Sequence, residues 1–506
     1  MRLTKLNEKL WLAVLAAICL VYILLRLWHL TDSCLWFDEI FSVHAAEHDW
    51  NNLFSFVAAD LIHPPLFYAL LKLWIAAGGE SLFWLRLFPV FFSCVALVPL
   101  YLLCRGLKLD YPAFALALAF LAVNGALVKY AQEVRMYSLL LCLSLFSMWL
   151  FVRFLNLGKS FWILTLINVL LVYTHYFGWF VVLSEVASIL ILQRIKIRQI
   201  LVMLGVNLLA FAPWIFAVWQ ASRASSDLAQ NIGWISKPNA ATIIQFVFNL
   251  IEPFYFQASS IDKSSNFYIS VPILLIITAA KIFYLYDWRN QSETEKRDFI
   301  LLSIFVSVPI LLAFAASWIF PYSIWGTRHL SIVFAPVAIL TAVFINKISD
   351  KTARLSAFAL LVTLFAAAFI FQIKSAPPKF IWCGWENLAA SIDTHEPQKI
   401  YVFEDLVAYH FWFAMRASER VQIAEVKNIK GVVEDKSYFL PREFDKITAT
   451  DESGIEGERF WIAFRDKEFD PTRPPLQNFI QKGYKIGEPK TFEAQNLKAF
   501  LVLAEK

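Results

Sequence analysis

Long apolar runs separated by short polar connections fill the first three quarters of the chain. Several of these runs extend for roughly 17–22 residues without a charge, enough for a helix to cross a hydrocarbon core of about 30 Å. A core helix of a water-soluble protein would alternate apolar and polar faces instead. The pattern predicts about eleven membrane-spanning helices, at approximately 10–30, 83–104, 112–129, 137–156, 161–174, 177–193, 199–219, 268–286, 299–318, 329–346 and 354–372.

The charges of the connections test this count, because Lys and Arg concentrate on the cytoplasmic side of membrane proteins. If the N-terminus lies inside, every inner connection is basic. These inner residues are Arg2, Lys5, Lys9, Arg105, Lys108, Arg153, Lys159, Arg194, Lys196, Arg198, Arg289, Lys296, Arg297, Lys347, Lys351 and Arg354. The first apolar run, at 10–30, then acts as an uncleaved signal-anchor.

The least marked boundary lies at Thr174-His175-Tyr176, where one long tilted helix could replace two short ones. A single helix would invert all later connections and place the basic run at 194–198 outside. The charge pattern therefore favours two helices, with the C-terminal tail on the outer side.

Beyond about residue 373 the composition becomes mixed and charged. Alternating apolar residues predict strands at 399–403, 421–424, 459–464 and 499–503, with a short helix at 475–482. We expect residues 1–373 to form the membrane domain and 374–506 a small extracytoplasmic α/β domain. The predicted fold class is an all-α polytopic membrane protein with this α/β domain attached.

Composition supports the membrane class: 59% of the residues are apolar and only 17% are charged. The net charge of +5 includes no basic tract large enough for a nucleic-acid partner. Metal-binding spacings such as CxxC and HExxH are missing, and we expect no metal or other cofactor. Glycine-rich phosphate loops are also missing, so we do not expect a soluble nucleotide as the direct substrate. Of the six cysteines, only Cys34 and Cys383 are expected outside, where they could pair; we do not predict a disulfide framework.

The first outer loop, at about 31–82, carries the adjacent carboxylates Asp38 and Glu39 after Leu35-Trp36-Phe37. Adjacent acids beside a bilayer are costly unless they are solvated or functional. A solvated pair is one interpretation, and Asp38 as the cap of a helix that starts near Glu39 is another. The apolar neighbours favour a segment that lies in the interface and carries the chemistry.

Other polar groups fall on the same predicted side. They are His63 and Tyr68 around Pro64-Pro65, then Glu133, Arg135 and Tyr137, then His175, and finally Arg328 and His329. Taken singly, each has a structural explanation: Glu133 and Arg135 as an interfacial ion pair, His175 as a structural histidine, and Arg328 as an interfacial anchor. Their convergence on one face favours a site.

Transfer of a sugar from a lipid phosphate uses such a set of residues. A carboxylate can act as general base toward the acceptor hydroxyl. A fixed Arg or His can stabilise the charge that develops on the leaving phosphate. Aromatic side chains can stack on the sugar and line a groove for the lipid.

Four motifs carry a resemblance to a known family. They are Leu35-Trp36-Phe37-Asp38-Glu39, His63-Pro64-Pro65-Leu66-Phe67-Tyr68, Gln132-Glu133-Val134-Arg135-Met136-Tyr137 and Thr174-His175-Tyr176-Phe177. With them the chain resembles the GT-C glycosyltransferases, and more closely the bacterial branch of the protein O-mannosyltransferase and aminoarabinose-lipid A transferase superfamily (glycosyltransferase 39/83-like). The resemblance covers about 10–372, and the tail is similar only in its placement.

The resemblance implies a polyprenyl-phosphate-sugar donor and a periplasmic active site between the bacterial inner membrane and the first-loop helices. Asp38 would be the general base or acceptor-binding carboxylate, supported by Glu39, and Glu133 the second acid. Arg328 would contact the donor phosphate. The further substrate-binding positions would be His63, Tyr68, Arg135, Tyr137, His175 and His329. An Arg-Tyr pair is more usual in the family where this chain has Arg328-His329, which leaves the role of His329 open.

The acceptor would be a lipid, a polysaccharide or a protein. Two alternatives share the topology: a ligase that joins a lipid-linked glycan to another carrier, and a transporter of a lipid-linked sugar. A ligase would favour a large late outer loop rich in Arg and His, whereas the loop at 320–329 is short. A transporter would favour broken helices, inverted repeats and charges at mid-membrane depth. We identify none of these in the sequence, and a purely structural scaffold would not need clustered carboxylates.

Overall fold

The computed structural model describes residues 2–193, 196–224, 232–253, 267–374, 379–429, 431–432, 440–441 and 444–506. The chain divides into two compact units. The first contains the long apolar helices. The second joins Thr31–Asp49 and 232–234 to the described residues of 379–506. Each unit is considered by itself.

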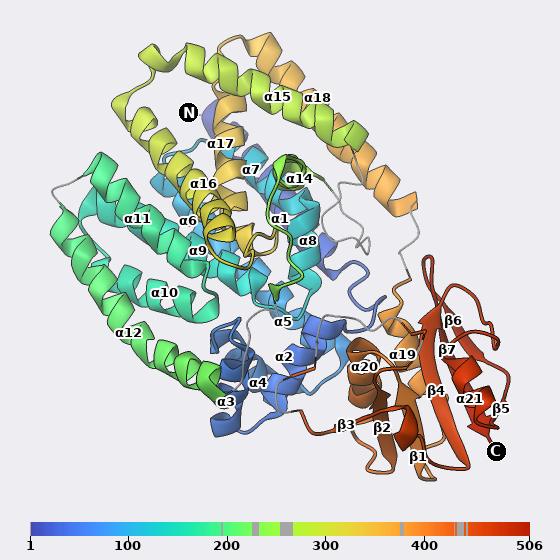
Figure 1. Ribbon diagram of the computed structural model, residues 1–506. Helices are drawn as coiled ribbons and strands as arrows, with labels where there is room; N and C mark the ends of the chain where they lie inside the picture. The colour runs from blue at the N-terminus through green and yellow to red at the C-terminus, as the bar shows by residue number, and fades with distance from the viewer. Residues whose placement is uncertain are drawn as a thin grey trace. The chain divides into compact units, whose positions relative to one another are not determined.

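The first unit is helical throughout its regular structure, as the blue-to-orange part of Figure 1 shows. Its helices are α1 (Arg2–Leu27), α3 (Trp50–Asp60), α4 (Leu66–Gly78), α5 (Leu82–Val95), α6 (Leu97–Gly106), α7 (Tyr111–Val123), α8 (Gly125–Gln132), α9 (Tyr137–Leu157), α10 (Phe161–Thr174), α11 (Gly178–Leu192), α12 (Ile197–Ala224), α14 (Ala240–Ile251), α15 (Phe267–Tyr286), η2 (Trp288–Asn290), α16 (Glu293–Ile319), η3 (His329–Val333), α17 (Phe334–Asn346) and α18 (Lys351–Lys374).

Among the described residues, eight helices are long and apolar enough to cross a membrane. The shorter apolar helices α7, α10 and α11 coincide with three further predicted spans, and together they account for every span expected from the sequence. The doubtful boundary at His175 is confirmed, because α10 ends at Thr174 and α11 begins at Gly178. The chain is a multi-pass membrane protein.

The span expected at 112–129 is broken into α7 and α8 at Asn124. The Asn124 side chain accepts a hydrogen bond from the backbone amide of Leu127 (3.0 Å), so it caps the new helix. Its amide nitrogen donates to the carbonyl oxygens of Asn249 and Leu250 (3.1 and 3.2 Å). The expected continuous span is thus interrupted at Asn124, whose side chain connects α8 to the end of α14. The following helix, α8, leads to Glu133.

A charged residue also lies within a membrane helix, contrary to our interpretation of the sequence. Glu185, halfway along α11, is fully buried. It accepts hydrogen bonds from the Ser147 hydroxyl and from the Asn168 side-chain amide, both at 2.7 Å. Because these polar partners come from α9 and α10, the carboxyl group links three helices at a depth where the sequence suggested only apolar packing.

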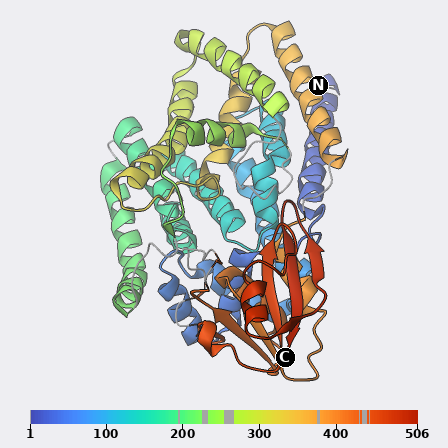
Figure 2. The same ribbon diagram turned by 45° about the vertical axis from the view of Figure 1, so that its right-hand side comes forward.

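Seven strands among the described residues of the second unit form one sheet, in the order β3-β2-β1-β4-β7-β5 with β6 also on β7. Figure 2 shows the strands side by side. Their bounds are β1 (Gln398–Val402), β2 (Val421–Val426), β3 (Ile447–Thr450), β4 (Arg459–Asp466), β5 (Lys485–Ile486), β6 (Lys490–Glu493) and β7 (Lys498–Glu505). The pairs β1–β2, β2–β3 and β1–β4 are parallel, whereas β7 is antiparallel to its three neighbours.

Helices cover both faces of this sheet, so each face has an apolar core. One core contains Trp385 of α19 (Trp382–Ala389) and Phe411 of α20 (Asp405–Met415). The other contains Phe479 of α21 (Leu476–Gln481), which packs with Tyr401 and Phe460 from the strands. A short 3-10 helix, η4 (Glu452–Gly454), follows β3. The α/β class predicted for the tail is confirmed.

The first outer loop contributes a helix to the second unit. This helix, α2 (Phe37–Glu47), packs on α20, and its Ile40 is part of the core that α20 covers. A disulfide bond joins Cys34, just before α2, to Cys383 in α19. This bond was not predicted from the sequence, because 349 residues separate the two cysteines and no local pattern connects them.

Candidate functional site

The Gln132–Tyr137 motif forms a tight connection between α8 and α9. The backbone amide of Arg135 donates to the Glu133 carbonyl oxygen at 2.6 Å, and the chain between the helices is buried. Gln132 supports the end of α1, since its amide donates to the carbonyl oxygens of Arg26 and Trp28 (3.2 and 2.6 Å). The motif therefore fixes one end of the helix bundle and carries two charged side chains there.

Glu133 is 6% exposed and forms an ion pair with Lys129, one turn earlier in α8. The distance from the Lys129 Nζ to the Glu133 Oε1 is 3.9 Å. Lys129 was not predicted as a site residue, since it falls at the end of the span expected at 112–129. The signal that would have found it is the four-residue spacing to Glu133, which puts both side chains on one helix face.

Arg135 connects this motif to the first outer loop. Its Nη2 lies 3.3 Å from the Nε2 of His63, and its Nη1 donates to the Tyr68 hydroxyl at 3.4 Å. The other ring nitrogen of His63, Nδ1, lies 3.4 Å from an Asp60 carboxylate oxygen. Asp60, at the end of α3, is a second member of the site that the sequence analysis missed. A rigid Pro64-Pro65 turn follows His63 and sets the start of α4.

Three histidines meet next to Arg135. The ring centroids of His63 and His175 are 5.5 Å apart, and those of His175 and His329 are 5.3 Å apart. Tyr137 lies 6.4 Å from both His175 and His329 by the same measure. We call His63, Tyr68, Arg135, Tyr137, His175 and His329 the histidine cluster. All six residues were predicted from the sequence to bind substrate, and the structure brings them together.

His175 is neutral and presents a hydrogen-bond donor. Its Nδ1 accepts a hydrogen bond from the Phe177 backbone amide (3.1 Å), so its proton resides on Nε2. Burial, together with His329, His63 and the guanidinium groups of Arg135 and Arg328, holds the pKa of His175 well below its usual value. The ring is 4% exposed, and none of the described residues accepts a hydrogen bond from its Nε2.

Arg328 precedes His329 and is partly exposed. The neighbouring Thr327 hydroxyl accepts a hydrogen bond from the Asn249 side chain at 3.2 Å, and Asn249 is in turn tied to Asn124. The late outer loop is therefore fixed to the α7–α8 break. The positive charge of Arg328 is one of the causes that lower the pKa of His175.

Asp38 and Glu39 belong to the second unit, at the start of α2. Glu39 is fully buried, and its Oε2 accepts a hydrogen bond from the Trp36 backbone amide at 3.1 Å. Glu39 thus caps the helix from its first turn. The alternative that Asp38 caps a helix starting near Glu39 is wrong, since the helix begins at Phe37 and Asp38 lies inside its first turn. Asp38 is partly exposed.

The structure therefore divides the predicted residues into two groups. Glu133, Arg328 and the histidine cluster lie in the first unit, whereas Asp38 and Glu39 lie in the second. In the part of the chain that the structure describes, no group of three or more His, Cys, Asp or Glu side chains is arranged to hold a metal ion. Within the first group, the buried histidine cluster offers hydrogen-bond donors and the Arg135 cation, which suit an anion.

Comparison with solved structures decides the fold. ArnT from Cupriavidus metallidurans in the apo state superposes with a TM-score of 0.57 at 11% identity, over 98% of this chain and 98% of that chain. The same protein bound to undecaprenyl phosphate gives 0.53 at 10% identity, over 97% and 98% of the two chains. ArnT and the archaeal oligosaccharyltransferase AglB, which also resembles this chain, are both GT-C superfamily membrane glycosyltransferases.

The chain has the GT-C fold. Its likeness to the Archaeoglobus fulgidus oligosaccharyltransferase tethered with an acceptor peptide is weaker, with a TM-score of 0.50 at 14% identity. That match covers 82% of this chain, which spans 64% of the length of the oligosaccharyltransferase. No protein-family model matches the chain, and no curated protein matches it. The GT-C fold is the one that the four motifs implied.

Proposed function

We propose that the chain is an integral-membrane glycosyltransferase that moves a sugar from a polyprenyl-phosphate donor to a hydroxyl or phosphate acceptor on the periplasmic face. The observation that carries the proposal is the histidine cluster. It combines Arg135 and the neutral His175 in a buried setting, and the partly exposed Arg328 directly precedes its member His329. A phosphate is the ligand whose oxygens accept hydrogen bonds from such groups and whose charge they neutralise.

Three kinds of support converge on this function. The fold is that of ArnT, which was solved in complex with undecaprenyl phosphate. The long apolar helices give a lipid-linked donor a route within the bilayer. The disulfide between Cys34 and Cys383 favours an oxidising compartment for the second unit, which agrees with a periplasmic location for Asp38.

The residues then take distinct roles. Asp38, partly exposed at the start of α2, accepts the proton of the acceptor hydroxyl, while Glu39 organises the helix start. Arg328, Arg135 and His175 bind the donor phosphate and stabilise the charge that grows on it as the glycosidic bond breaks. Glu133, paired with Lys129, is the second acid, and His63, Tyr68, Tyr137 and His329 complete the donor site.

Glu185 bears on the transporter alternative, since a transporter would have charges at mid-membrane depth. Both of its carboxylate oxygens accept hydrogen bonds from neighbouring helices, an arrangement that serves helix packing. The ligase alternative differs from the transferase in the donor that it consumes. A ligase is therefore recognised by the donor that it consumes, and a transporter by a donor that crosses the membrane unchanged.

The test is to incubate membranes that contain the protein with a panel of radiolabelled undecaprenyl-phosphate hexoses and pentoses. We expect one donor to be consumed, with free undecaprenyl phosphate and a labelled lipid, polysaccharide or protein as products. Membranes without the protein are the control. If no single-sugar donor is consumed but a lipid-linked oligosaccharide is, the chain is a ligase; if labelled donor crosses the membrane unchanged, it is a transporter.

A further inference from the structure

Helix α2 is attached to the C-terminal domain by contacts along most of its length. At its start, the Cys34–Cys383 disulfide holds the chain four residues before Asp38. At its end, the Arg416 Nε lies 2.8 Å from a carboxylate oxygen of Glu47. Between these points the helix packs on α20. A segment from the first outer loop is thus built into a domain that lies more than 300 residues later in the sequence.

One face of α2 is apolar and belongs to the core of that domain. Ile40 is 2% exposed and packs in the cluster that includes Trp385 and Phe411. Phe37 packs against the same cluster, and its ring centroid lies 5.3 Å from that of Tyr409. Since residues three and four positions apart share a helix face, Phe37, Ile40 and His44 all face α20.

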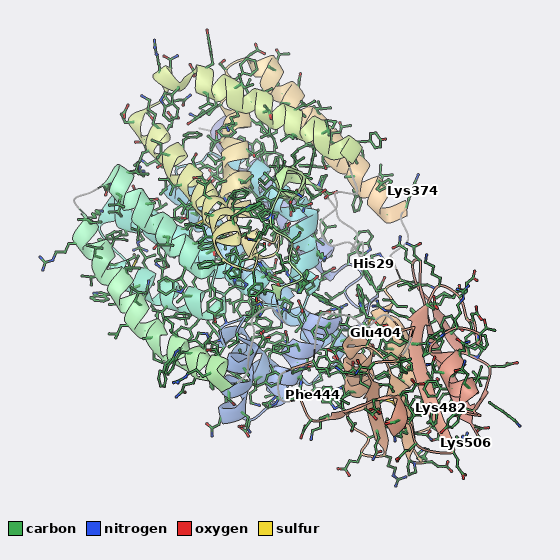
Figure 3. All side chains as sticks on the ribbon, viewed as in Figure 1. His29, Lys374, Glu404, Phe444, Lys482 and Lys506 are labelled. Atoms are coloured by element: carbon green, nitrogen blue, oxygen red, sulfur yellow. A yellow bond between two sulfur atoms is a disulfide. The ribbon has the colours of Figure 1, made fainter. Side chains whose placement is uncertain are left out.

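His44 fits a pocket of aromatic rings on the same side. Its Nδ1 lies 2.9 Å from the Tyr409 hydroxyl. Its ring centroid is 4.6 Å from that of Trp412 and 5.5 Å from that of Phe444, a residue labelled in Figure 3. Tyr409 and Trp412 stack on each other at 5.5 Å. These ring contacts and the contact with the Tyr409 hydroxyl hold the imidazole against α20.

Asp38 is next to this attached face but does not belong to it. Glu39 is buried and hydrogen-bonded to the Trp36 amide, whereas Asp38 remains partly exposed. Because Asp38 lies in the first turn of α2, the groups that hold α2 also hold its backbone. A displacement of about 1 Å at a reacting group can lower a rate by about 100-fold. The contacts that hold α2 on the C-terminal domain can therefore affect the rate of transfer.

We propose that the C-terminal domain positions the catalytic carboxylate: Tyr409, His44 and the Cys34–Cys383 disulfide fix α2 and so hold Asp38 in the orientation that transfer requires. The inference rests on the proposed function, because it takes Asp38 as the group that activates the acceptor. Tyr409 and His44 are positioning residues, which act through Asp38 and touch neither donor nor acceptor.

The test compares two tyrosines of the same domain in the full-length purified enzyme. Tyr409→Phe removes the hydroxyl that contacts His44. Tyr401→Phe removes a hydroxyl that donates to the Glu456 carbonyl oxygen at 3.0 Å, in the core on the other face of the sheet. With whichever undecaprenyl-phosphate sugar the panel identifies, we expect Tyr409→Phe to lower kcat about fivefold or more and to leave the donor KM within about twofold. Tyr401→Phe should leave both constants unchanged.

Two further measurements separate positioning from loss of folding. Amide hydrogen exchange of residues 37–47 should rise in Tyr409→Phe and in the Cys34→Ser/Cys383→Ser pair, while exchange of β1, β4 and β7 stays at the wild-type level. In both variants, we expect kcat to be lower than in the wild type where the protection of α2 against exchange is also lower. Equal kinetic constants for Tyr409→Phe and the wild type, or equal losses in Tyr409→Phe and Tyr401→Phe, would overturn the proposal.

Asp38→Asn, measured in parallel, distinguishes this failure from failure of the proposed function. If Asp38→Asn is inactive and Tyr409→Phe is normal, only the positioning role is lost. If Asp38→Asn transfers sugar normally, the role of Asp38 itself is wrong, and the positioning proposal falls with it.

Discussion

His175 is a buried side chain that offers a hydrogen-bond donor to a ligand. Its neutral ring has a proton on Nε2 and no acceptor among the described residues, so a ligand oxygen is the natural partner. We expect His175→Phe to raise the donor KM about tenfold, the effect of losing one hydrogen bond to a charged group. His175→Gln, which retains a donor near the same position, is the matched control, and steady-state kinetics with varied donor is the measurement.

The effect of substituting His175 should not depend on pH in the neutral range. Because the pKa of His175 is held well below its usual value, the ring stays neutral through the neutral range. The difference between wild type and His175→Phe should therefore be constant from about pH 6 to pH 8. A difference that disappears above pH 6.5 would mean that the charged imidazolium, and not the neutral ring, binds the donor.

Glu133 offers a second test at a single side chain. We expect Glu133→Gln to lower the rate of transfer at least about tenfold, because the amide keeps the shape of the side chain and removes its charge. Glu80→Gln, in the exposed part of the first outer loop, is the control for the loss of a carboxylate. Transfer at the wild-type rate by Glu133→Gln would return Glu133 to a structural pair with Lys129.

The sequence was informative about side chains that break the apolar pattern. His63, Arg135, His175 and His329 stand out because polar groups in apolar surroundings have few explanations, and the structure groups them. Asp60 and Lys129 were missed, since each lies near a helix end where a charge is ordinary. Their roles come from tertiary contacts to His63 and Glu133, which no local pattern contains.

Among elements, helix α20 and the strands beside it contain a buried acidic pair. Burial, and after it the hydrogen bond and charge of Asp405, raises the pKa of Glu425 to about 8, while Lys427 acts in the opposite direction. The folded protein therefore binds more protons than the unfolded chain between about pH 4.5 and pH 8, and the stability of the domain falls as pH rises through that window.

Glu425→Gln tests this pH dependence, since the amide has no charge to desolvate. We expect the variant to lose less stability than the wild type between pH 5.5 and pH 8, measured as protection of β1 and β2 in amide hydrogen exchange. Glu488→Gln, an exposed site in the same domain, should follow the wild type. Parallel pH dependences for Glu425→Gln and the wild type would contradict the assignment.

The predicted and observed elements agree where a long apolar run indicates a spanning helix or alternating apolar residues indicate a strand. The spans, the split at His175 and the strands β1, β2, β4 and β7 agree with expectation. The break at Asn124 was not predicted, because the hydrogen bonds from its side-chain amide go to carbonyl oxygens 125 and 126 residues away. The helix α20 was not predicted either. The place of α2 in the second unit likewise depends on a disulfide that spans most of the chain.

For the whole molecule, the basic connections predict an N-terminus in the cytoplasm and a C-terminus outside. A periplasm-specific reporter fused after Lys506 should be active, and the same reporter fused after Arg105 should be silent. A cytoplasm-specific reporter gives the reverse pattern. Activity of the cytoplasmic reporter after Lys506 would mean that the number of spans is wrong by one.

The most direct measurement of the central claim is sugar transfer by Asp38→Asn. The substitution keeps the size of the side chain and removes the carboxylate that takes up the proton of the acceptor hydroxyl. With the undecaprenyl-phosphate sugar that the wild type consumes, the account predicts at least about a thousandfold loss of transfer, with expression and the protection of α2 unchanged. Transfer by Asp38→Asn at the wild-type rate would contradict it.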